Sequence, residues 1–293
     1  MTRMSTYFTR AGRAGDDDLL FRTPELGKLK EKSLAVFGLG CLGAPSALEF
    51  ARAGIGQLTL VDHDFVDPGT IGRWPFGLSA AGLSKAEVLA EFIGQNYPST
   101  LVKPELHRIG DVRPPAPGFQ SQIETVDSLT EEASAIYDAT AELGVHHFLS
   151  DLASQLNIPY ISVYGTHGGW GGVVASIVPD RTGGCWMCLQ HALNDGTIKL
   201  PPSDPHGEIQ AAGCGDVTFT GAGFDMTLIA LAGVRMAVSV LCNDEDNAYP
   251  GADWDVMTIS LRDNHGGQIV PDYTGYTLER HLDCPLCHRD ERG

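Results

Sequence analysis

The sequence predicts an α/β fold: a Rossmann-like, doubly wound and mostly parallel sheet, extended by antiparallel strands and carrying a structural zinc site. Three features of the chain lead to this prediction. Short apolar strands alternate with helical segments from residue 34 to about residue 164. A glycine-rich loop joins the first strand to the first helix. Two Cys-x-x-Cys pairs follow in the second half of the chain, with the spacing that suits metal ligands.

The first strand, residues 34–37, runs directly into a loop whose glycines are Gly38, Gly40 and Gly43. A helical stretch continues to about residue 52. Glycines at these places let the backbone turn tightly and approach a phosphate, which the N-terminus of the helix then attracts. The bland alternative is a tight turn that only packs the helix on the sheet.

The second strand, residues 58–61, ends in Asp62, and Asp64 follows closely. An acid at this strand end is placed to accept hydrogen bonds from ribose hydroxyls, so loop and acid together indicate a nucleotide site. The same pattern serves NAD and FAD. Arg73 and Lys85 favour ATP, because two cations suit a polyphosphate and stabilise departing pyrophosphate. Taken singly, either cation is equally well explained as a solvated side chain.

The segment VDHDFVDPGTIGR, which precedes Lys85, resembles the ubiquitin-activating-type (ThiF/MoeB-like) adenylyltransferase family. The family pattern is close to VD-x-D-x-V-x-x-x-N-L-x-R, which Asp62, Asp64, Val66 and Arg73 match. Thr70 stands where the family has Asn. The resemblance extends from about residue 30 to the C-terminus, and it is strongest toward stand-alone bacterial activating enzymes of ubiquitin-like conjugation systems.

The elements that follow continue the alternation. Helices are predicted at 82–96 and about 142–156, and strands at 101–107, 136–140 and 160–164. In the first of these helices, Leu83, Val88, Leu89 and Phe92 are expected on the apolar side. The strand at 136–140 brings Asp138 to the carboxyl edge of the sheet, where ligands bind. A glycine turn and strand follow at 167–180, and a closing hairpin is predicted at about 255–270.

The chain is expected to divide into an N-terminal arm, residues 1–25, and an ATP-binding adenylation domain, residues 26–293. Within the domain a polar crossover loop at about 194–218 carries Cys214. The resemblance implies that an arginine of such an arm can enter the ATP site of a dimer mate. The arm contains Arg10, Arg13 and Arg22, and a solvated arm is the alternative for each.

Two cysteine pairs, Cys185 with Cys188 and Cys284 with Cys287, match the four thiolates of one tetrahedral zinc ion. Four protein ligands leave no open position, so the predicted role is structural. The resemblance supports this, because many family members carry such pairs at these places. The alternatives are a redox pair and plain buried cysteines.

Cys214 is the candidate nucleophile. It lies between two glycines at the end of the polar loop, shortly before a helix that starts near residue 224. A helix N-terminus lowers the pKa of a nearby thiol. The resemblance implies a catalytic cysteine at a similar place, and the alternative is an incidental loop cysteine. Cys41 and Cys242 are expected to be buried.

The resemblance implies that ATP and Mg²⁺ activate the C-terminal carboxylate of a ubiquitin-like protein. Cys214 would then take the acyl group as a thioester and pass it to a conjugating enzyme. Gly38, Gly40, Gly43, Asp62, Asp64, Arg73, Lys85 and Asp138 would hold the nucleotide. The family often reads D-x-T-D at Asp138, but here Ala141 replaces the second acid. The magnesium ligand therefore stays open between Asp138, Asp64 and Glu142.

The composition of the chain argues against nucleic-acid binding and against a membrane location. The net charge of −17 argues against nucleic acid as a partner. The apolar stretch at 226–241 is interrupted by Arg235 and reads as a buried helix, so no membrane is expected. Seven cysteines, four of them in metal-type pairs, predict a reducing, cytoplasmic location. A helix at about 224–241 that is apolar on several faces predicts a homodimer, as the resemblance also implies.

Three other functions remain open. The first is activation of a sulfur-carrier protein, which shares the adenylation step and differs in the fate of the acyl-adenylate. The second is an NAD-dependent oxidoreductase, which the glycine loop and Asp62 also allow. The third is a scaffold that keeps the fold without activity, which Thr70 and Ala141 would permit.

Overall fold

The structure is a computed structural model that describes residues 12, 15, 21–110, 122–210, 217–242 and 248–287. One sheet forms its centre, with eight strands in the order β10-β9-β6-β5-β4-β1-β2-β3. The strands are β1 (Ser33–Phe37), β2 (Gln57–Asp62), β3 (Leu101–Leu106), β4 (Ala135–Asp138), β5 (Tyr160–Gly165), β6 (Gly171–Ile177), β9 (Val256–Arg262) and β10 (Gln268–Tyr276). The first five of these run parallel, and β6, β9 and β10 extend the sheet antiparallel.

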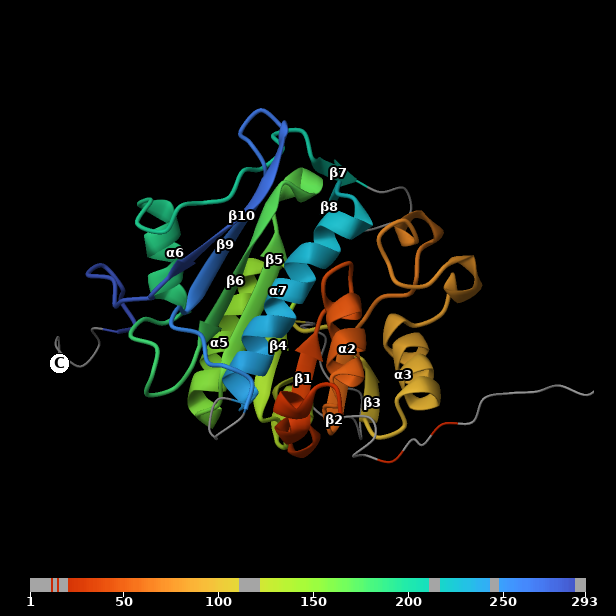
Figure 1. Cartoon of the computed structure of the whole chain (residues 1–293). Coiled ribbons are helices and arrows are strands. Elements are labelled where there is room, and N and C mark those ends of the chain that lie inside the picture. The colour runs from red at the N-terminus through yellow and green to blue at the C-terminus, as the bar shows by residue number, and fades with distance from the viewer. Residues whose placement is uncertain are drawn as a thin grey trace, which may run out of the picture.

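Helices cover both faces of the sheet (Figure 1). The helices α2 (Gly43–Arg52), α3 (Lys85–Asn96) and α7 (Gly223–Cys242) pack on one face, around a core that includes Phe50 and Tyr137. The helices α4 (Gln122–Thr130), α5 (Leu143–Leu156) and α6 (Trp186–Asn194) pack on the other, around Phe37 and Leu149. The central strands are therefore buried on both sides, which explains their continuous apolar runs.

This architecture confirms the predicted α/β class, the parallel core and the antiparallel extension. The predicted strands and helices all occur, with small shifts at their ends. Two details differ. Leu83 lies outside the helix and is exposed, because α3 begins at Lys85 with Ser84 as its cap. The sequence reading also missed α4 and α6, whose short apolar runs lie beside glycine and proline.

Helix α7 is the one described helix that is long and apolar enough to cross a membrane. Its most apolar 18-residue window is 61% buried inside the fold. It packs against β5, β6 and α2, so it serves as a core helix, as its interrupted apolar run predicted.

Part of the expected crossover loop forms regular secondary structure. The strands β7 (Glu208–Gln210) and β8 (Val217–Phe219) pair antiparallel as a small hairpin. Figure 1 shows this hairpin beyond the N-terminal end of α7, away from the main sheet. Of the predicted N-terminal arm, residues 12, 15 and 21–25 are described, and Phe21 among them is exposed.

Candidate functional site

A cavity of about 870 Å³ opens at the carboxyl ends of β1, β2 and β4. Parallel strands end at one edge of a sheet, so the loops that follow them meet there. The described lining residues come from several stretches of chain: within 37–42, within 61–74, Lys85, 107–109, within 139–145, Ile209 of β7, and 217–221. The cavity thus gathers the glycine loop, the acids after β2 and both predicted cations.

The glycine loop is held tightly against its surroundings. Gly38 has φ +81°, a conformation that favours glycine, and a Cβ there would lie 2.8 Å from the backbone of Ala139. A Cβ on Gly43 would lie 1.8 Å from the carbonyl oxygen of Gly38. Gly40 has open space around it, so its missing side chain leaves room in the cavity. Trp74, which the sequence reading missed, fixes the loop by donating its indole N–H to the Leu39 carbonyl at 2.8 Å.

Asp62 joins the glycine loop to the end of β2. It is buried, and its two carboxylate oxygens accept the backbone N–H groups of Leu39 at 2.6 Å and Asp64 at 2.7 Å. A carboxylate oxygen has two lone pairs, so each retains capacity for a further donor such as a hydroxyl. Asp62 therefore lies where the sequence predicted it and also holds the loop in place.

Lys85 is the first residue of α3, and its ammonium group reaches back to Asp64 at 2.7 Å. The pairing is set by the backbone, because the amide of Lys85 donates to the Asp64 carbonyl at 3.1 Å. Burial alone would raise the pKa of Asp64, but the hydrogen bond and charge of Lys85, with the charge of His63, lower it. Lys85 is nearly buried while Asp64 is half exposed, so a fixed cation stands at the cavity wall.

Arg73 lines the same cavity but faces the hairpin. Its guanidinium donates to the Thr218 hydroxyl at 2.9 Å and to the carbonyl oxygen of Phe219. It also lies over the Phe219 ring, 5.1 Å from the ring centre, in cation–π geometry. The ring of His167 stacks on Phe219 at 6.1 Å. The structure therefore places Arg73 at the cavity with two of its five N–H donors bound to β8.

Asp138 is not among the described residues that line the cavity. It is fully buried, and one carboxylate oxygen accepts both the amide and the hydroxyl of Thr140, at 3.0 and 2.7 Å. The other oxygen contacts His146 Nδ1 and the Tyr160 hydroxyl, each at 2.8 Å. Burial alone would raise the pKa of Asp138, but the charge and hydrogen bond of His146 and the donors of Thr140 lower it. This geometry argues against the predicted direct contact of Asp138 with a cofactor.

The carboxylates that do line the described cavity are Asp62, Asp64, Asp67 and Glu142. Carboxylate oxygens are the ligands that magnesium prefers, and Asp62, His63 and Asp64 bring their ligand atoms within 4.8 Å of one another. Ala141, at the position of the missing acid, has φ +57° and lines the cavity. Carboxylates that could hold magnesium therefore lie on two sides of the cavity, Asp62 and Asp64 after β2 and Glu142 after β4.

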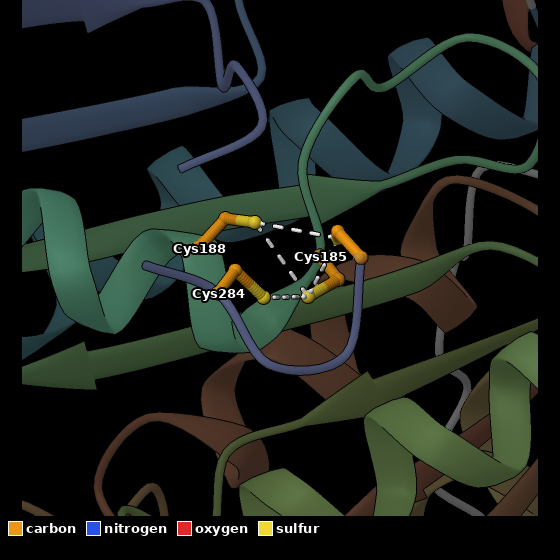
Figure 2. A group of neighbouring side chains, drawn as sticks. Cys185, Cys188 and Cys284 are labelled. Carbon is orange, nitrogen blue, oxygen red and sulfur yellow. Dashed lines mark hydrogen bonds between the residues drawn. The ribbon is translucent and has the colours of Figure 1, made fainter. Parts of the chain in front are cut away.

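The four predicted metal-binding cysteines come together (Figure 2). Four of their Sγ–Sγ distances are between 3.5 and 3.7 Å: Cys185 to Cys188, Cys284 and Cys287, and Cys188 to Cys287. A tetrahedron of 2.3 Å zinc–sulfur bonds has sulfur separations of about 3.8 Å. The donor set and its spacing therefore suit one zinc ion with four protein ligands.

The two pairs reach this cluster from different elements. Cys185 is the N-cap residue of α6 and Cys188 lies in the first turn of that helix, while burial raises the pKa of the Cys185 thiol to about 11. Cys284 and Cys287 form a turn after β10, held by the amide of His281, which donates to Cys188 Sγ at 3.4 Å. Burial would raise the pKa of Cys284, yet the backbone N–H groups of Cys287 and Leu286 lower it to about 7.

The remaining cysteines divide as follows. Cys41 lines the cavity. Burial raises the pKa of its thiol and so disfavours the thiolate, although the nearby charge of Arg73 acts in the opposite direction. Cys242 is buried at the end of α7. Cys214 lies outside the described residues, so its predicted role stays a prediction. The described strands on either side of it, β7 and β8, form one rim of the cavity through Ile209 and Val217.

The sequence matches the model of the ThiF family over residues 17–260. The chain is 35% identical over 281 residues to the uncharacterized protein y4qC of Sinorhizobium fredii, covering 93% of this chain and 46% of that protein. It is 29% identical over 213 residues to the adenylyltransferase and sulfurtransferase UBA4 of Yarrowia lipolytica, covering 70% of this chain and 46% of that protein. The chain thus spans about half the length of these curated relatives.

Among solved structures, Escherichia coli MccB in the crystal structure with ATP superposes with a TM-score of 0.62. The match covers 89% of this chain and 68% of that one at 17% sequence identity. At this identity the likeness concerns the fold, and it supports the layered sheet described above.

Proposed function

Because the chain belongs to the ThiF family, we propose that it uses ATP to adenylate the C-terminal carboxylate of a ubiquitin-like protein. The observation that carries the proposal is the cavity, where an open glycine loop, the buried Asp62 and two cations meet. Lys85 is held at its wall by Asp64, and Arg73 lies within reach of the same space. Two cations beside a glycine loop suit a polyphosphate better than the single pyrophosphate of a dinucleotide cofactor.

The proposed reaction begins when ATP binds in the cavity. The phosphates lie on Gly38, Gly40 and Gly43, and the ribose hydroxyls donate to Asp62. A carboxylate oxygen of the partner attacks the α-phosphorus, and the bond to pyrophosphate breaks. Lys85 and Arg73 stabilise the negative charge that leaves with pyrophosphate.

The second step transfers the acyl group to a cysteine. The thiolate of Cys214 attacks the carbonyl carbon of the acyl-adenylate, and AMP leaves with the bonding electrons. The resulting thioester is then passed to the thiol of a conjugating enzyme. The position of β7 and β8 at the rim of the cavity supports this assignment, since they flank residue 214.

Magnesium would bind with the nucleotide, and its charge would neutralise part of the phosphate charge. Asp64 and Glu142 are the residues proposed to hold it, because both carboxylates line the cavity and are exposed to it. Asp138 is not proposed as a ligand, since each of its oxygens already accepts two hydrogen bonds.

The adenylation step is tested by ATP–pyrophosphate exchange in the presence of the partner protein. Lys85→Ala should lower exchange by about tenfold or more, the scale of losing one charge stabiliser. Lys103→Ala is the matched control, because Lys103 pairs with Glu132 on the exposed surface of β3. Equal exchange in wild type and Lys85→Ala would refute the assignment, and the absence of any exchange would refute adenylation.

A second candidate function shares this first step. The relative named adenylyltransferase and sulfurtransferase UBA4 supports activation of a sulfur-carrier protein, with sulfur transfer to the acyl-adenylate. The two functions differ in whether a thioester to Cys214 accumulates. Family membership gives no support to the NAD-dependent alternative.

We also propose that two copies pair through α7. Its outer face presents Phe224, Leu228 and Leu231, which follow a helical spacing and are 74%, 39% and 37% exposed. Light scattering at micromolar concentration should give the mass of a dimer, and Leu228→Glu should lower it toward one chain. A monomeric wild type would refute the pairing.

A further inference from the structure

A buried network beneath the cavity connects the glycine loop with the cysteine cluster. Its centre is Asp138 at the end of β4, which is 0% exposed, and His146 on α5, which is 4% exposed. The Nδ1 atom of His146 lies 2.8 Å from a carboxylate oxygen of Asp138. An ionised carboxylate can only accept, so Nδ1 carries the proton and donates it.

On one side, this network fixes the turn that supports the glycine loop. Asp138 accepts the amide and the hydroxyl of Thr140, which closes the turn 138–140. The backbone of this turn lies directly against Gly38, since a Cβ there would be 2.8 Å from Ala139 and Thr140. A displacement of the carboxylate therefore displaces the surface on which Gly38 rests.

On the other side, the network touches the cysteine cluster through Trp186. This residue follows Cys185 directly, and its ring lies 4.8 Å from the ring of His146 at a tilt of 34°. It is 2% exposed and also meets Tyr160 edge-on at 6.0 Å. The start of α6, which carries two of the cysteines, therefore packs on the residue that orients Asp138.

We propose that His146 is a positioning residue for the nucleotide loop and that Trp186, packed on its ring, joins that role to the cysteine cluster. The inference rests on the proposed nucleotide site, but it assigns a function to residues that contact neither nucleotide nor metal. His146 keeps the Asp138 carboxylate ionised and aimed at Thr140. Trp186 restricts the ring of His146 to the orientation in which Nδ1 faces that carboxylate.

The test compares three single variants. His146→Leu removes the donor and leaves a buried carboxylate short of one hydrogen bond, so the affinity for ATP should fall by about tenfold. His146→Asn places an amide N–H near the position of Nδ1 and should restore affinity to within about threefold. His147→Leu is the matched control, because His147 is the next residue and touches Trp186 edge-on at 6.3 Å. It should bind ATP as wild type does.

Two readouts separate a positioning role from a merely structural one. The ATP affinity of the folded protein is measured by titration calorimetry without the partner protein. Hydrogen exchange of the amides at residues 38–43 is measured without nucleotide, and it should be faster in His146→Leu alone. One further outcome separates this inference from the proposed function. If wild type does not bind ATP but the amides at residues 38–43 still exchange faster in His146→Leu, the proposed function is refuted and the positioning role of His146 stands.

A double variant tests the connection to Trp186. If Trp186 acts through His146, then Trp186→Leu should weaken ATP binding in wild type and have no further effect in His146→Leu. If His146→Leu does not fold, Trp186→Leu alone replaces it, because that change removes the ring packed on His146 at 4.8 Å. Unchanged ATP affinity and loop exchange in His146→Leu, or in Trp186→Leu in its place, would overturn the proposal.

Discussion

The guanidinium of Arg73 and the hydroxyl of Thr218 are hydrogen-bonded at 2.9 Å, although 145 residues separate them in the chain. The contact ties the segment after β2 to the hairpin at the rim of the cavity. It also occupies one of the five N–H donors of a side chain that is proposed to stabilise phosphate charge. We expect the nucleotide to draw the guanidinium away from the hairpin, so that its binding competes with this contact.

Thr218→Val should strengthen ATP binding by roughly two- to twelvefold, since one neutral hydrogen bond contributes about 0.5–1.5 kcal/mol. The change removes the hydroxyl that holds Arg73 and keeps the side-chain volume. Arg73→Ala should weaken pyrophosphate exchange by about tenfold or more. Both are measured on the same preparation by calorimetry and exchange. Weaker binding in Thr218→Val would show that the contact supports the nucleotide site instead of competing with it.

The cysteine cluster should hold about one zinc per chain by metal analysis. Cys284→Ser should lose the metal and lower the melting temperature by about 5 °C or more, because bound metal stabilises the folded state alone. Cys242→Ser, on α7, should keep its metal. A folded, metal-free wild-type protein with four reactive thiols at these positions would exclude the site.

Cys214→Ala should keep pyrophosphate exchange and lose a covalent adduct with the ubiquitin-like protein. The carboxylate attacks ATP directly, so the thiol is needed only for the second step. The adduct is followed on a non-reducing gel with ATP and magnesium, before and after a thiol reductant is added. Cys214→Ser should retain the partner as an oxygen ester that resists thiols.

Two other results of the same gel would change the assignment. A thiol-sensitive band that persists in Cys214→Ala would move the nucleophile to Cys41 or Cys242. Intact exchange with no covalent band in wild type would favour the sulfur-carrier function.

Asp138 should make stability depend on pH in the acid range. Its pKa in the folded chain is lowered, so its pairing stabilises the fold fully above the unfolded pKa of about 3.9 and is lost as pH falls further. Asp138→Asn should reduce the free energy of unfolding at pH 7 by roughly 1–3 kcal/mol. Denaturant titrations should show this difference shrinking as the pH falls below about 4. A difference that stays constant with pH would contradict the assignment.

The strand ends of this fold were predictable because they are local. Residues 34–37 and 58–61 are short apolar runs bounded by glycine and acid, and the periodicity of the next helix is strong. Asp62 follows from the same logic, since the residue after a parallel strand lies at the binding edge. The cysteine pairs were equally readable, because their ligand spacing is a chemical signature.

The partners of these residues were not predictable, because they come from distant segments. His146 contacts Asp138 only because α5 packs on β4, so the hydrogen bonds of this acid could not be read from its place in the sequence. Trp74 reaches Leu39 from a segment that reads as a polar loop. Nothing in the order of residues indicates that β8 would occupy Arg73.

A zinc ion bound by all four cysteines would join two distant parts of the chain into a closed loop. Cys185 and Cys284 are 99 residues apart, and the hairpin, α7, β9 and β10 all lie between them. If the ion stays bound during unfolding, these elements unravel as a loop with joined ends, which has far fewer conformations than an open chain. In the chain-entropy treatment of cross-links, a loop of about 100 residues corresponds to about 4.7 kcal/mol. Part of the stability of this half of the sheet would then arise because the cross-link lowers the conformational entropy of the unfolded state. The free energy of unfolding should also fall less steeply with denaturant concentration in zinc-loaded protein than in zinc-free protein.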